Sequence, residues 1–426
     1  MKIVILTAGT GSFHCGTCMR DNALVVELRR QGHDAVLVPM YLPPILDEEG
    51  ELAPLFYGGI NVYLQQKSAL FRKSPRWLDR LFDSPGALKA AARRSGSMTS
   101  AAELGDLTLS MLRGEEGRQR KELERLAEWL RELRPEVVVL SNALLLGLGP
   151  ALRRATGAPV VCMMTGEDTF LDSLPEGQRE EAWAGVARLA GEMDACIAIS
   201  RYYADLMRAR AGIPDEKMRV VHAGINLEGF APGEPPPVPT IGYLARMCYA
   251  KGLHTLVDAF IALRRRGKVP DTVLRAAGSQ TAADAEYVAT LRDRLEKAGL
   301  SEAAAFTPNI SREEKIRFLQ GLTILSVPAT YGESFGLYVV EAMAAGVPLV
   351  QPRHAAFPEL LEATGAGILV EPDDPEALAA GLEELLLDPA RARSLGAAGR
   401  RAAEERFTVE RMARRTLAVL QDVTRG

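Results

Sequence analysis

Two carboxylates frame a short apolar stretch in the segment YGESFGLYVVEAMAAG (331–346). Glu333 stands in a loop, and Glu341 stands among leucine, valine, alanine and methionine residues. A helix that begins near Phe335 would place Glu341 on a largely apolar face. Because an unpartnered buried carboxylate is costly, we expect either ligand hydroxyls or structural salt bridges to satisfy both groups.

The backbone at the start of this helix is a second candidate binding feature. The first amides of a helix have no partner within the helix and attract anions. Glu333 directly precedes the residues whose amides point outward here, which are Ser334, Phe335, Gly336 and Leu337. We therefore expect a polar ligand to meet one carboxylate before the helix and the other within it.

Two cations follow a predicted strand in the segment IGYLARMCYAKGLHTLVDAF (241–260). Arg246 stands at the end of the strand, and Lys251 stands just before the next helix. Two positive charges beside the positive end of a helix suit a doubly charged anion, such as a nucleotide diphosphate. The alternative is that both residues are ordinary loop charges.

The turn AGTGSFHCGTC (8–18) lies between a strand and a helix, where a ligand can approach the backbone. His14 stands where a dinucleotide fingerprint has its third glycine, so a tight connection explains the turn equally well. Cys15 and Cys18 form a C-x-x-C pair, but no second pair has metal-site spacing. We therefore predict small loop thiols and no metal site.

Short β-branched runs alternate with helical segments almost throughout the chain, which predicts parallel sheets with helices on both faces. The predicted strands of the first half are IVILTA, DAVLVPM, EVVVLS, PVVCMM, DACIAIS and MRVVH, and those of the second half are TIGYLAR, TVLRAAG, AAAFTP, TILSVPA and VPLVQP. Between the two halves, the segment APGEPPPVP (231–239) is rich in proline and predicts a stiff link.

The fold class predicted is therefore α/β, with two doubly wound, Rossmann-like domains facing a cleft. The first domain covers 1–232 and the second covers 240–407, with the link at 231–239 and a C-terminal helix at 408–426 that closes the first domain. The segment 42–117 has little strand signal and reads as an atypical insertion.

Within that insertion, residues 71–94 mix lysine and arginine with large apolar side chains. This pattern favours either a basic amphipathic element on a membrane or acidic substrate, or an insertion packed on the first domain.

The composition is that of a soluble globular protein, with 47% hydrophobic and 25% charged residues. A net charge of −4 gives no support for nucleic-acid binding. The N-terminus lacks the length and flanks of a signal peptide, no apolar run is long enough to span a bilayer, and five cysteines fit a reducing compartment. We predict a cytoplasmic protein with possible peripheral membrane contact through 71–94.

The combined motifs resemble those of the family 4 retaining glycosyltransferases, which have the GT-B fold. The resemblance rests on ESFGLYVVEAMAAGVPLV, with seven residues between Glu333 and Glu341, on the Arg246 and Lys251 pair, and on the segment 357–389. The segments 199–230 and RQGHDAVLV (30–38) are also similar to the family. The likeness spans most of the chain except 42–117.

The resemblance implies a role for each matching residue. Arg246 and Lys251 would hold the diphosphate of a nucleotide-sugar donor and stabilise it as a leaving group, and Glu333 would contact the donor sugar. Glu341 would accept hydrogen bonds from the ribose. The remaining contacts implied are the amides of Phe335, Gly336 and Leu337 to sugar or phosphate, the turn at Gly11 and Ser12 to the diphosphate, and Asn309 near the base. No cofactor beyond the donor substrate is implied.

The chain departs from the family after the strand PVVCMM, where many members have a histidine that contacts the sugar. Here the sequence reads Thr165, Gly166, Glu167, Asp168. Glu167 and Asp168 either replace that contact or cap a helix. Two alternatives to a hexosyltransferase follow: a nucleotide-sugar epimerase of the same architecture, or a sugar-nucleotide binding protein without catalysis.

Overall fold

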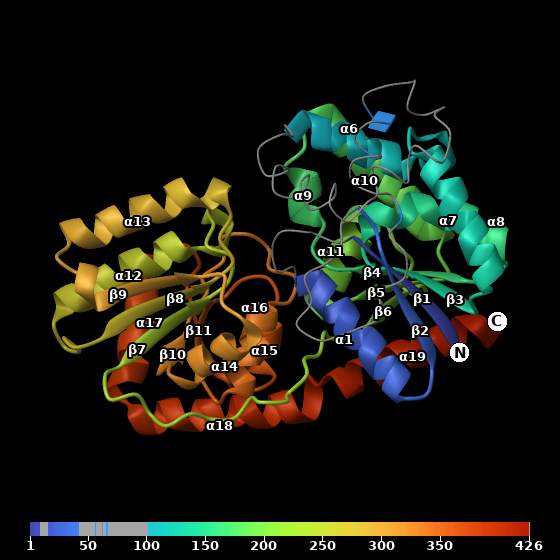
Figure 1. The fold of residues 1–426 in the computed structure, drawn as a ribbon. Coiled ribbons are helices and arrows are strands. Elements are labelled where there is room, and N and C mark those ends of the chain that lie inside the picture. Colours follow the sequence, from blue (N-terminus) through green and yellow to red (C-terminus); the bar gives the residue numbers. More distant parts are fainter. Residues whose placement is uncertain (9–15, 42–55, 57–61, 63–64, 67–100, 426) are drawn as a thin grey trace. The chain divides into compact units, whose positions relative to one another are not determined.

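The computed structural model describes residues 1–8, 16–41, 56, 62, 65–66 and 101–425 (Figure 1). The predicted amphipathic element at 71–94 lies outside the described residues, as do Gly11, Ser12 and most of the atypical insertion. The chain divides into two compact units. Unit 1 comprises Met1–His222 with Met412–Gly426, and unit 2 comprises Ala223–Arg411.

Unit 1 contains a six-stranded parallel sheet in the order β2-β1-β3-β4-β5-β6. Its strands are β1 (Lys2–Thr7), β2 (Asp34–Pro39), β3 (Val137–Leu140), β4 (Val160–Met164), β5 (Ala195–Ala198) and β6 (Met218–Val220). Nearly all residues of the central strands are buried, as expected for a sheet covered on both faces.

The helices of unit 1 connect these strands and cover the sheet. They are α1 (Gly16–Arg30), α6 (Ala101–Leu112), α7 (Arg120–Leu133), α8 (Gly149–Thr156), α9 (Asp168–Asp172), α10 (Glu176–Glu192) and α11 (Arg201–Ala211), and the chain ends in α19 (Val409–Arg425), with short 3₁₀ turns at Gly114–Glu116 and Ala143–Leu148. Helix α1 runs beside β1 and β2 (Figure 1). From Met412 onward, α19 belongs to unit 1 and buries Ala413 and Leu420.

Unit 2 contains a second six-stranded parallel sheet, in the order β12-β11-β10-β7-β8-β9. Its strands are β7 (Thr240–Leu244), β8 (Val273–Gly278), β9 (Ala304–Pro308), β10 (Ile324–Leu325), β11 (Leu349–Pro352) and β12 (Gly367–Val370). Its helices are α12 (Leu253–Arg266), α13 (Ala285–Lys297), α14 (Arg312–Gln320), α15 (Leu337–Ala344), α16 (Phe357–Glu362), α17 (Pro375–Leu387) and α18 (Pro389–Arg406), with 3₁₀ turns at Tyr249–Lys251, Ala282–Asp284 and Ser301–Ala303.

Two parallel sheets with interleaved helices confirm the α/β, doubly wound fold class predicted from the sequence. In each sheet the first strand of the unit lies inside the sheet, and the chain proceeds first to one side and then to the other. The strand order therefore reverses between β1 and β3 in unit 1, and between β7 and β10 in unit 2. Ligands of open α/β sheets bind beside the carboxyl ends of strands at such a reversal.

The proline-rich segment 231–239 belongs to unit 2, because the division between the units falls before Ala223. The chain is already attached to unit 2 ahead of the prolines. Ile225 accepts a hydrogen bond from Val409 and donates one to Phe407, and Phe230 is buried. The prolines line one wall of a groove of about 280 Å³ whose other wall includes residues 345–348. The prolines therefore pack on unit 2 in addition to linking the chain before residue 231 to the chain after residue 239.

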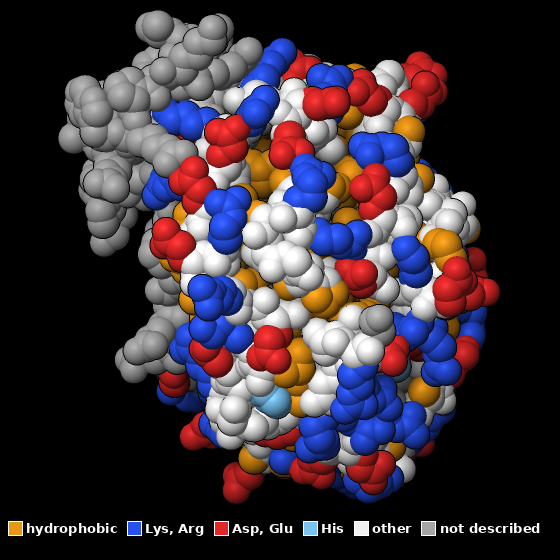
Figure 2. Space-filling view, turned by 90° about the vertical axis from the view of Figure 1, so that its right-hand side faces the viewer, with side chains coloured by type: hydrophobic (Ala, Val, Ile, Leu, Met, Phe, Trp, Pro, Cys, Tyr) orange, Lys and Arg blue, Asp and Glu red, His pale blue; other side chains and the backbone are white. Residues whose placement is uncertain are grey.

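Figure 2 shows one face of the molecule, on which lysine and arginine side chains are interspersed with aspartate and glutamate. Apolar side chains appear there as small separated areas. Within the described ranges, the helices are all too short or too polar to cross a membrane.

Candidate functional site in unit 2

Two loops meet at the strand-order reversal of unit 2. Strands β7 and β10 are neighbours, so the loops that follow them start side by side. The amide of Thr330 donates to the carbonyl of Ala250 at 3.0 Å. Gly252 has a φ of +70°, and a Cβ atom there would lie only 1.7 Å from the carbonyl oxygen of Pro328. Glycine is thus required at this position, and the contact brings Lys251 against the second loop.

Lys251 and Glu333 form the centre of the site. The Nζ of Lys251 lies 2.5 Å from Oε2 of Glu333 and also contacts the hydroxyl of Tyr331. The same Oε2 accepts hydrogen bonds from the hydroxyls of Tyr331, at 3.1 Å, and of Tyr338, at 2.8 Å. The ammonium group also lies 4.7 Å from the ring centroid of Tyr331. Glu333 is buried and the Lys251 side chain is 21% exposed, so the cation reaches the surface while its partner does not.

The protonation states in this cluster follow from its contacts. Burial alone would raise the pKa of Glu333, but the charge of Lys251 and the hydrogen bonds from Lys251, Tyr338 and Tyr331 hold that pKa below its usual value. Burial and the charge of Glu333 raise the pKa values of Tyr331 and Tyr338 well above the usual range. The cluster thus consists of one carboxylate, one ammonium and two phenols that remain donors.

Arg246 is held at the carboxyl end of β7 by Asp284. Its Nε and Nη2 donate to the two carboxylate oxygens of Asp284, at 3.1 and 3.0 Å. Asp284 also accepts hydrogen bonds from the amide and hydroxyl of Thr281 in a capping box. Burial opposes ionisation of Asp284, yet its contacts with Arg246 and Thr281 lower its pKa. The Arg246 side chain is 40% exposed, so it is fixed by Asp284 and still reaches the surface.

The helix α15 begins at Leu337, two residues later than the start near Phe335 that the sequence predicts. Gly336, with a φ of +83°, breaks the helical path just before it. The side chain of Phe335 is buried edge-on against Phe407, at 5.9 Å between ring centroids, and Ser334 is also buried. Gly336, the residue that precedes α15, contributes no side-chain cap. A contact of the backbone at Phe335, Gly336 and Leu337 with a ligand stays a prediction.

Glu341 lies one turn into α15 and is paired with Lys315 of α14, at 2.7 Å between Oε1 and Nζ. Both side chains are largely buried, with exposures of 12% for Glu341 and 13% for Lys315. Each carboxylate of the opening motif thus has a lysine partner, as the salt-bridge alternative expected. A role for Glu341 at a ribose stays a prediction.

Asn309 follows β9 in a left-handed conformation, with a φ of +58°. Its side chain forms two hydrogen bonds with the backbone of Gln280: Oδ1 accepts from the amide at 3.0 Å, and Nδ2 donates to the carbonyl at 3.2 Å. These contacts join the loops after β8 and β9. Whether Asn309 also contacts a base stays a prediction.

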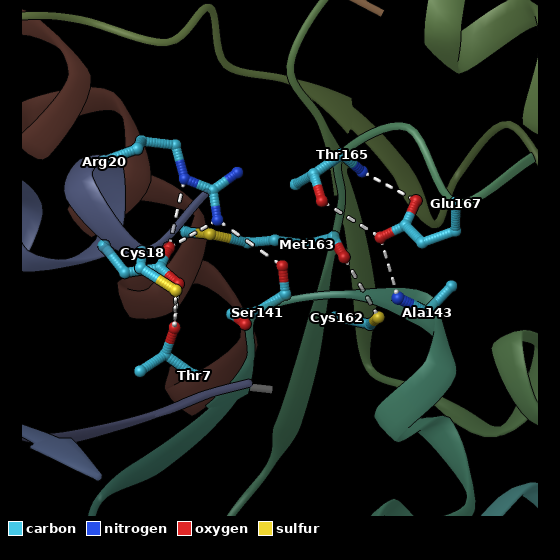
Figure 3. A network of polar contacts seen from close by, with 10 residues as sticks. Thr7, Cys18, Arg20, Ser141, Ala143, Cys162, Met163, Thr165 and Glu167 are labelled. Carbon is cyan, nitrogen blue, oxygen red and sulfur yellow. Dashed lines mark hydrogen bonds and ion pairs between the residues drawn. The ribbon is translucent and has the colours of Figure 1, made fainter. Parts of the chain in front are cut away.

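In unit 1, the buried side chain of Glu167 connects two turns and does not cap α9. Its carboxylate accepts hydrogen bonds from the amides of Ala143, Thr165 and Gly166, at 2.8 to 3.0 Å, and from the hydroxyl of Tyr203 at 2.9 Å. It joins the turn after β3 to the turn after β4 (Figure 3). Glu167 occupies the cap position of α9, but its side chain accepts from none of that helix's amides.

Asp168, the next residue, is buried, and burial raises its pKa despite hydrogen bonding to Tyr203. Its Oδ1 has no hydrogen-bond partner among the described residues. Of the two acidic residues after β4, Asp168 is therefore the one with a polar atom left for a ligand.

The structure adds four residues that the sequence interpretation missed, which are Tyr331, Tyr338, Asp284 and Lys315. The two tyrosines lie within the motif itself, so proximity to Glu333 could have indicated them. The partners Asp284 and Lys315 come from distant segments and carry no local signal. Within the described part of the chain, no three His, Cys, Asp or Glu residues are grouped so as to hold a metal ion.

Comparison with known families separates the chain into two matched regions. Residues 105–228 match the model described as "Glycosyltransferase Family 4", and residues 227–402 match "Glycosyl transferases group 1". The chain belongs to the family 4 glycosyltransferases, an enzyme family. The second match contains Arg246, Lys251, Glu333 and Glu341, and the first contains Glu167 and Asp168.

Two curated relatives illustrate the similarity. A GDP-mannose-dependent alpha-(1-6)-phosphatidylinositol monomannoside mannosyltransferase of Mycolicibacterium smegmatis is 29% identical over 59% of this chain and 67% of its own length. A D-inositol 3-phosphate glycosyltransferase of Streptomyces bingchenggensis is 30% identical over 60% of this chain and 59% of its own. The chain thus spans about three-fifths to two-thirds of these relatives.

Solved structures with the same fold cover the whole chain. Sucrose-phosphate synthase from Thermosynechococcus elongatus superposes with a TM-score of 0.73 at 19% identity, covering 99% of each chain. Anabaena Alr3699/HepE in complex with UDP superposes with a TM-score of 0.68 at 16% identity, covering 99% of this chain and all of that one. The fold is the two-domain GT-B fold, as the sequence resemblance implied.

Proposed function

We propose that this glycosyltransferase moves a hexosyl group from a nucleotide diphosphate sugar to a hydroxyl of an acceptor, with retention of anomeric configuration. The observation that carries the proposal is the pair of anchored cations, Arg246 and Lys251, beside the strand-order reversal of unit 2. Each is held by a buried carboxylate on one side and is partly exposed on the other. Two cations held in this way suit a diphosphate better than a single cation would.

The two cations would act on the leaving group. As the bond between sugar and diphosphate breaks, negative charge develops on the phosphate oxygens, and fixed positive charges stabilise that state without reorganisation. Tyr331 and Glu333 hold the ammonium of Lys251 in place, and Asp284 holds Arg246. Two fixed cations supply the charge that a metal ion would otherwise provide, so we propose that no metal cofactor is required.

The other predicted residues would surround the same donor. We propose that Glu333 contacts hydroxyls of the sugar, that Glu341 contacts the ribose, and that the amides from Phe335 to Leu337 bind the sugar or phosphate. Asn309 would lie near the base, and Gly11 and Ser12, which are outside the described residues, would approach the diphosphate. The departing phosphate would help to take the proton of the acceptor.

The named relatives suggest which substrates to try first. One is a GDP-mannose-dependent enzyme, another acts on D-inositol 3-phosphate, and a structural neighbour was solved with UDP-glucose. We therefore propose a hexose donor and a polyhydroxylated acceptor, and place the acceptor on unit 1.

The test combines binding with product analysis. Thermal shift of the full chain against UDP-, GDP- and ADP-sugars identifies the donor, and release of nucleotide diphosphate is then followed with inositol, D-inositol 3-phosphate and simple sugars. A new glycoside that keeps the anomeric configuration of the donor supports the proposal. An isomerised donor would identify an epimerase, and donor binding without release under any condition would identify a binding protein.

A further inference from the structure

A buried polar network connects α1 to the first strands of unit 1 (Figure 3). Asp21 accepts a hydrogen bond from the hydroxyl of Thr7 at 2.8 Å and pairs with the neighbouring Arg20, whose Nε lies 3.1 Å from Oδ1. Nη2 of Arg20 also points to the carbonyl of Ser141, at 3.4 Å. All four residues are buried, with at most 4% exposure. Arg20 is thus fixed by a carboxylate and a carbonyl.

Two polar atoms of this network lack a hydrogen-bond partner within the described parts of the chain. They are Nη1 of Arg20 and Oγ of Ser141, which belong to residues in direct contact. In Figure 3 the third nitrogen of Arg20 carries no dashed line and points away from Ser141. Buried polar atoms are nearly always satisfied, and leaving them unpaired costs stability. Two such atoms in neighbouring residues indicate that hydroxyl groups of a ligand complete the network.

The location agrees with a ligand site. Thr7 is the last residue of β1 and Ser141 directly follows β3, so the network lies at the carboxyl ends of the two strands where the order of the unit 1 sheet reverses. Open α/β sheets bind ligands at this point. None of the donor-binding residues proposed above comes from the network.

The charges favour a neutral hydroxyl over an anion. The charge of Arg20 is already balanced by Asp21, and two more buried acids, Glu167 and Asp168, follow the adjacent strand β4. A phosphate placed there would meet more negative than positive charge. Hydroxyl groups, by contrast, can accept from the N–H groups of Nη1 and both accept from and donate to Oγ of Ser141.

We propose that Arg20 and Ser141 form a subsite of unit 1 in which each residue binds a hydroxyl group of a polyhydroxylated acceptor. The proposal rests on the proposed function, because it assigns the other substrate of the same transfer. Arg20 contributes a fixed donor and Ser141 contributes an adaptable hydroxyl, so the subsite selects the acceptor by its hydroxyl pattern and not by its charge.

The sharpest test is Ser141→Ala, because this change removes an unpartnered hydroxyl and should leave the melting temperature equal or higher. We expect KM for the acceptor that wild type uses fastest to rise about three- to ten-fold, as loss of one neutral hydrogen bond does. KM for the donor should stay within about two-fold. Thr416→Val is the matched control, since Thr416 is also buried with an unpartnered hydroxyl but lies on α19.

Arg20→Lys gives an independent reading, because it keeps the positive charge beside Asp21 and removes Nη1. It should raise KM for the acceptor more than it lowers kcat, and the effect should not depend on salt concentration. An unchanged acceptor KM in both variants would overturn the proposal, and so would a rise confined to the donor KM or an equal effect of Thr416→Val.

Failure of the proposed function gives a different result, namely no release of nucleotide diphosphate by wild type with any donor. The subsite is then tested by calorimetric titration of inositol and simple sugars into wild type and into the Ser141→Ala protein. Weaker binding to the Ser141→Ala protein than to wild type would support the subsite, and indistinguishable titrations would reject it.

Discussion

Substitution of Lys251 gives the most direct test of the proposed chemistry. Its ammonium is fixed by Glu333 and by Tyr331 and is still partly exposed. Lys251→Met should lower turnover by about a hundred-fold or more, because a fixed charge would be lost where the leaving group develops its own. Lys268→Met is the control, since Lys268 also pairs with a buried carboxylate of unit 2, Glu383. Full activity of the Lys251→Met protein in a nucleotide-release assay would exclude the role at the diphosphate.

The depressed pKa of Glu333 predicts a dependence of stability on acid. A carboxylate whose pKa is lower in the folded state contributes stability above its unfolded pKa, with a reference value of 4.5, and loses it as the pH falls through the folded pKa. Unit 2 of wild type should therefore lose stability below that value. In the Glu333→Gln protein this part of the loss should be absent, and stability at neutral pH should be lower. Urea unfolding followed by circular dichroism from neutral pH to about pH 3 measures both, with the exposed Glu234→Gln as control. Parallel pH profiles of Glu333→Gln and wild type would contradict the assignment.

At this scale the sequence indicated candidate charged groups of the site but not the residues that pair with them. Arg246, Lys251, Glu333 and Glu341 lie in short motifs whose spacing is visible in one dimension. Their partners Asp284 and Lys315 are brought in by sheet order and helix packing, which single motifs do not encode. Arg20 gave no sequence signal, because an arginine on an N-terminal helix usually faces solvent.

At the scale of elements, the pair Lys315–Glu341 joins α14 to α15. Its contribution to the stability of unit 2 can be measured without a ligand. Removing one partner leaves the other charged and largely buried. Lys315→Met and Glu341→Gln should thus each destabilise unit 2, and the double variant should be less unstable than the sum by about 1–2 kcal/mol. Denaturant unfolding of the four proteins gives this coupling energy, and additive effects would show that the pair does not connect the helices.

The same two variants examine the ribose prediction. If Glu341 contacts the ribose, Glu341→Gln should weaken nucleotide binding, whereas Lys315→Met should do so only as far as it displaces Glu341. Calorimetric titration with the nucleotide found by thermal shift decides between them. Unchanged affinity in the Glu341→Gln protein would leave this residue a purely structural role.

The order of most strands and helices was predictable because their periodicities are local and strong, but the edge strand β12 (Gly367–Val370) was not predicted. The boundaries of helices and linkers were predicted less well where a single residue sets the direction of the backbone. The left-handed Gly336 delays α15 to Leu337, although the apolar pattern before it reads as helix. The prolines at 231–239 read as a link, yet they pack on unit 2, because neighbouring residues such as Phe230 are already buried there.

At the scale of the molecule, unit 1 is built from two distant parts of the sequence, since it takes in Met412–Gly426 of α19. Leu420 and Ala413 of this segment are completely buried. Stability of unit 1 should therefore depend on residues almost two hundred positions away from the rest of it. Leu420→Ala should destabilise unit 1 by about 2–4 kcal/mol, through lost burial and the cavity left behind.

The tryptophans allow the two units to be followed separately, because Trp77, Trp129 and Trp183 all precede residue 223. Trp129 and Trp183, the described tryptophans, make fluorescence a report on unit 1, whereas circular dichroism reports on both units. In the Leu420→Ala protein, the fluorescence transition should move to lower denaturant concentration while the part of the circular dichroism change assigned to unit 2 stays in place. Leu387→Ala, at a half-exposed position of unit 2, should move neither. A shift of both transitions together in Leu420→Ala would mean that the units unfold as one cooperative body, and an unmoved fluorescence transition would mean that α19 does not support unit 1.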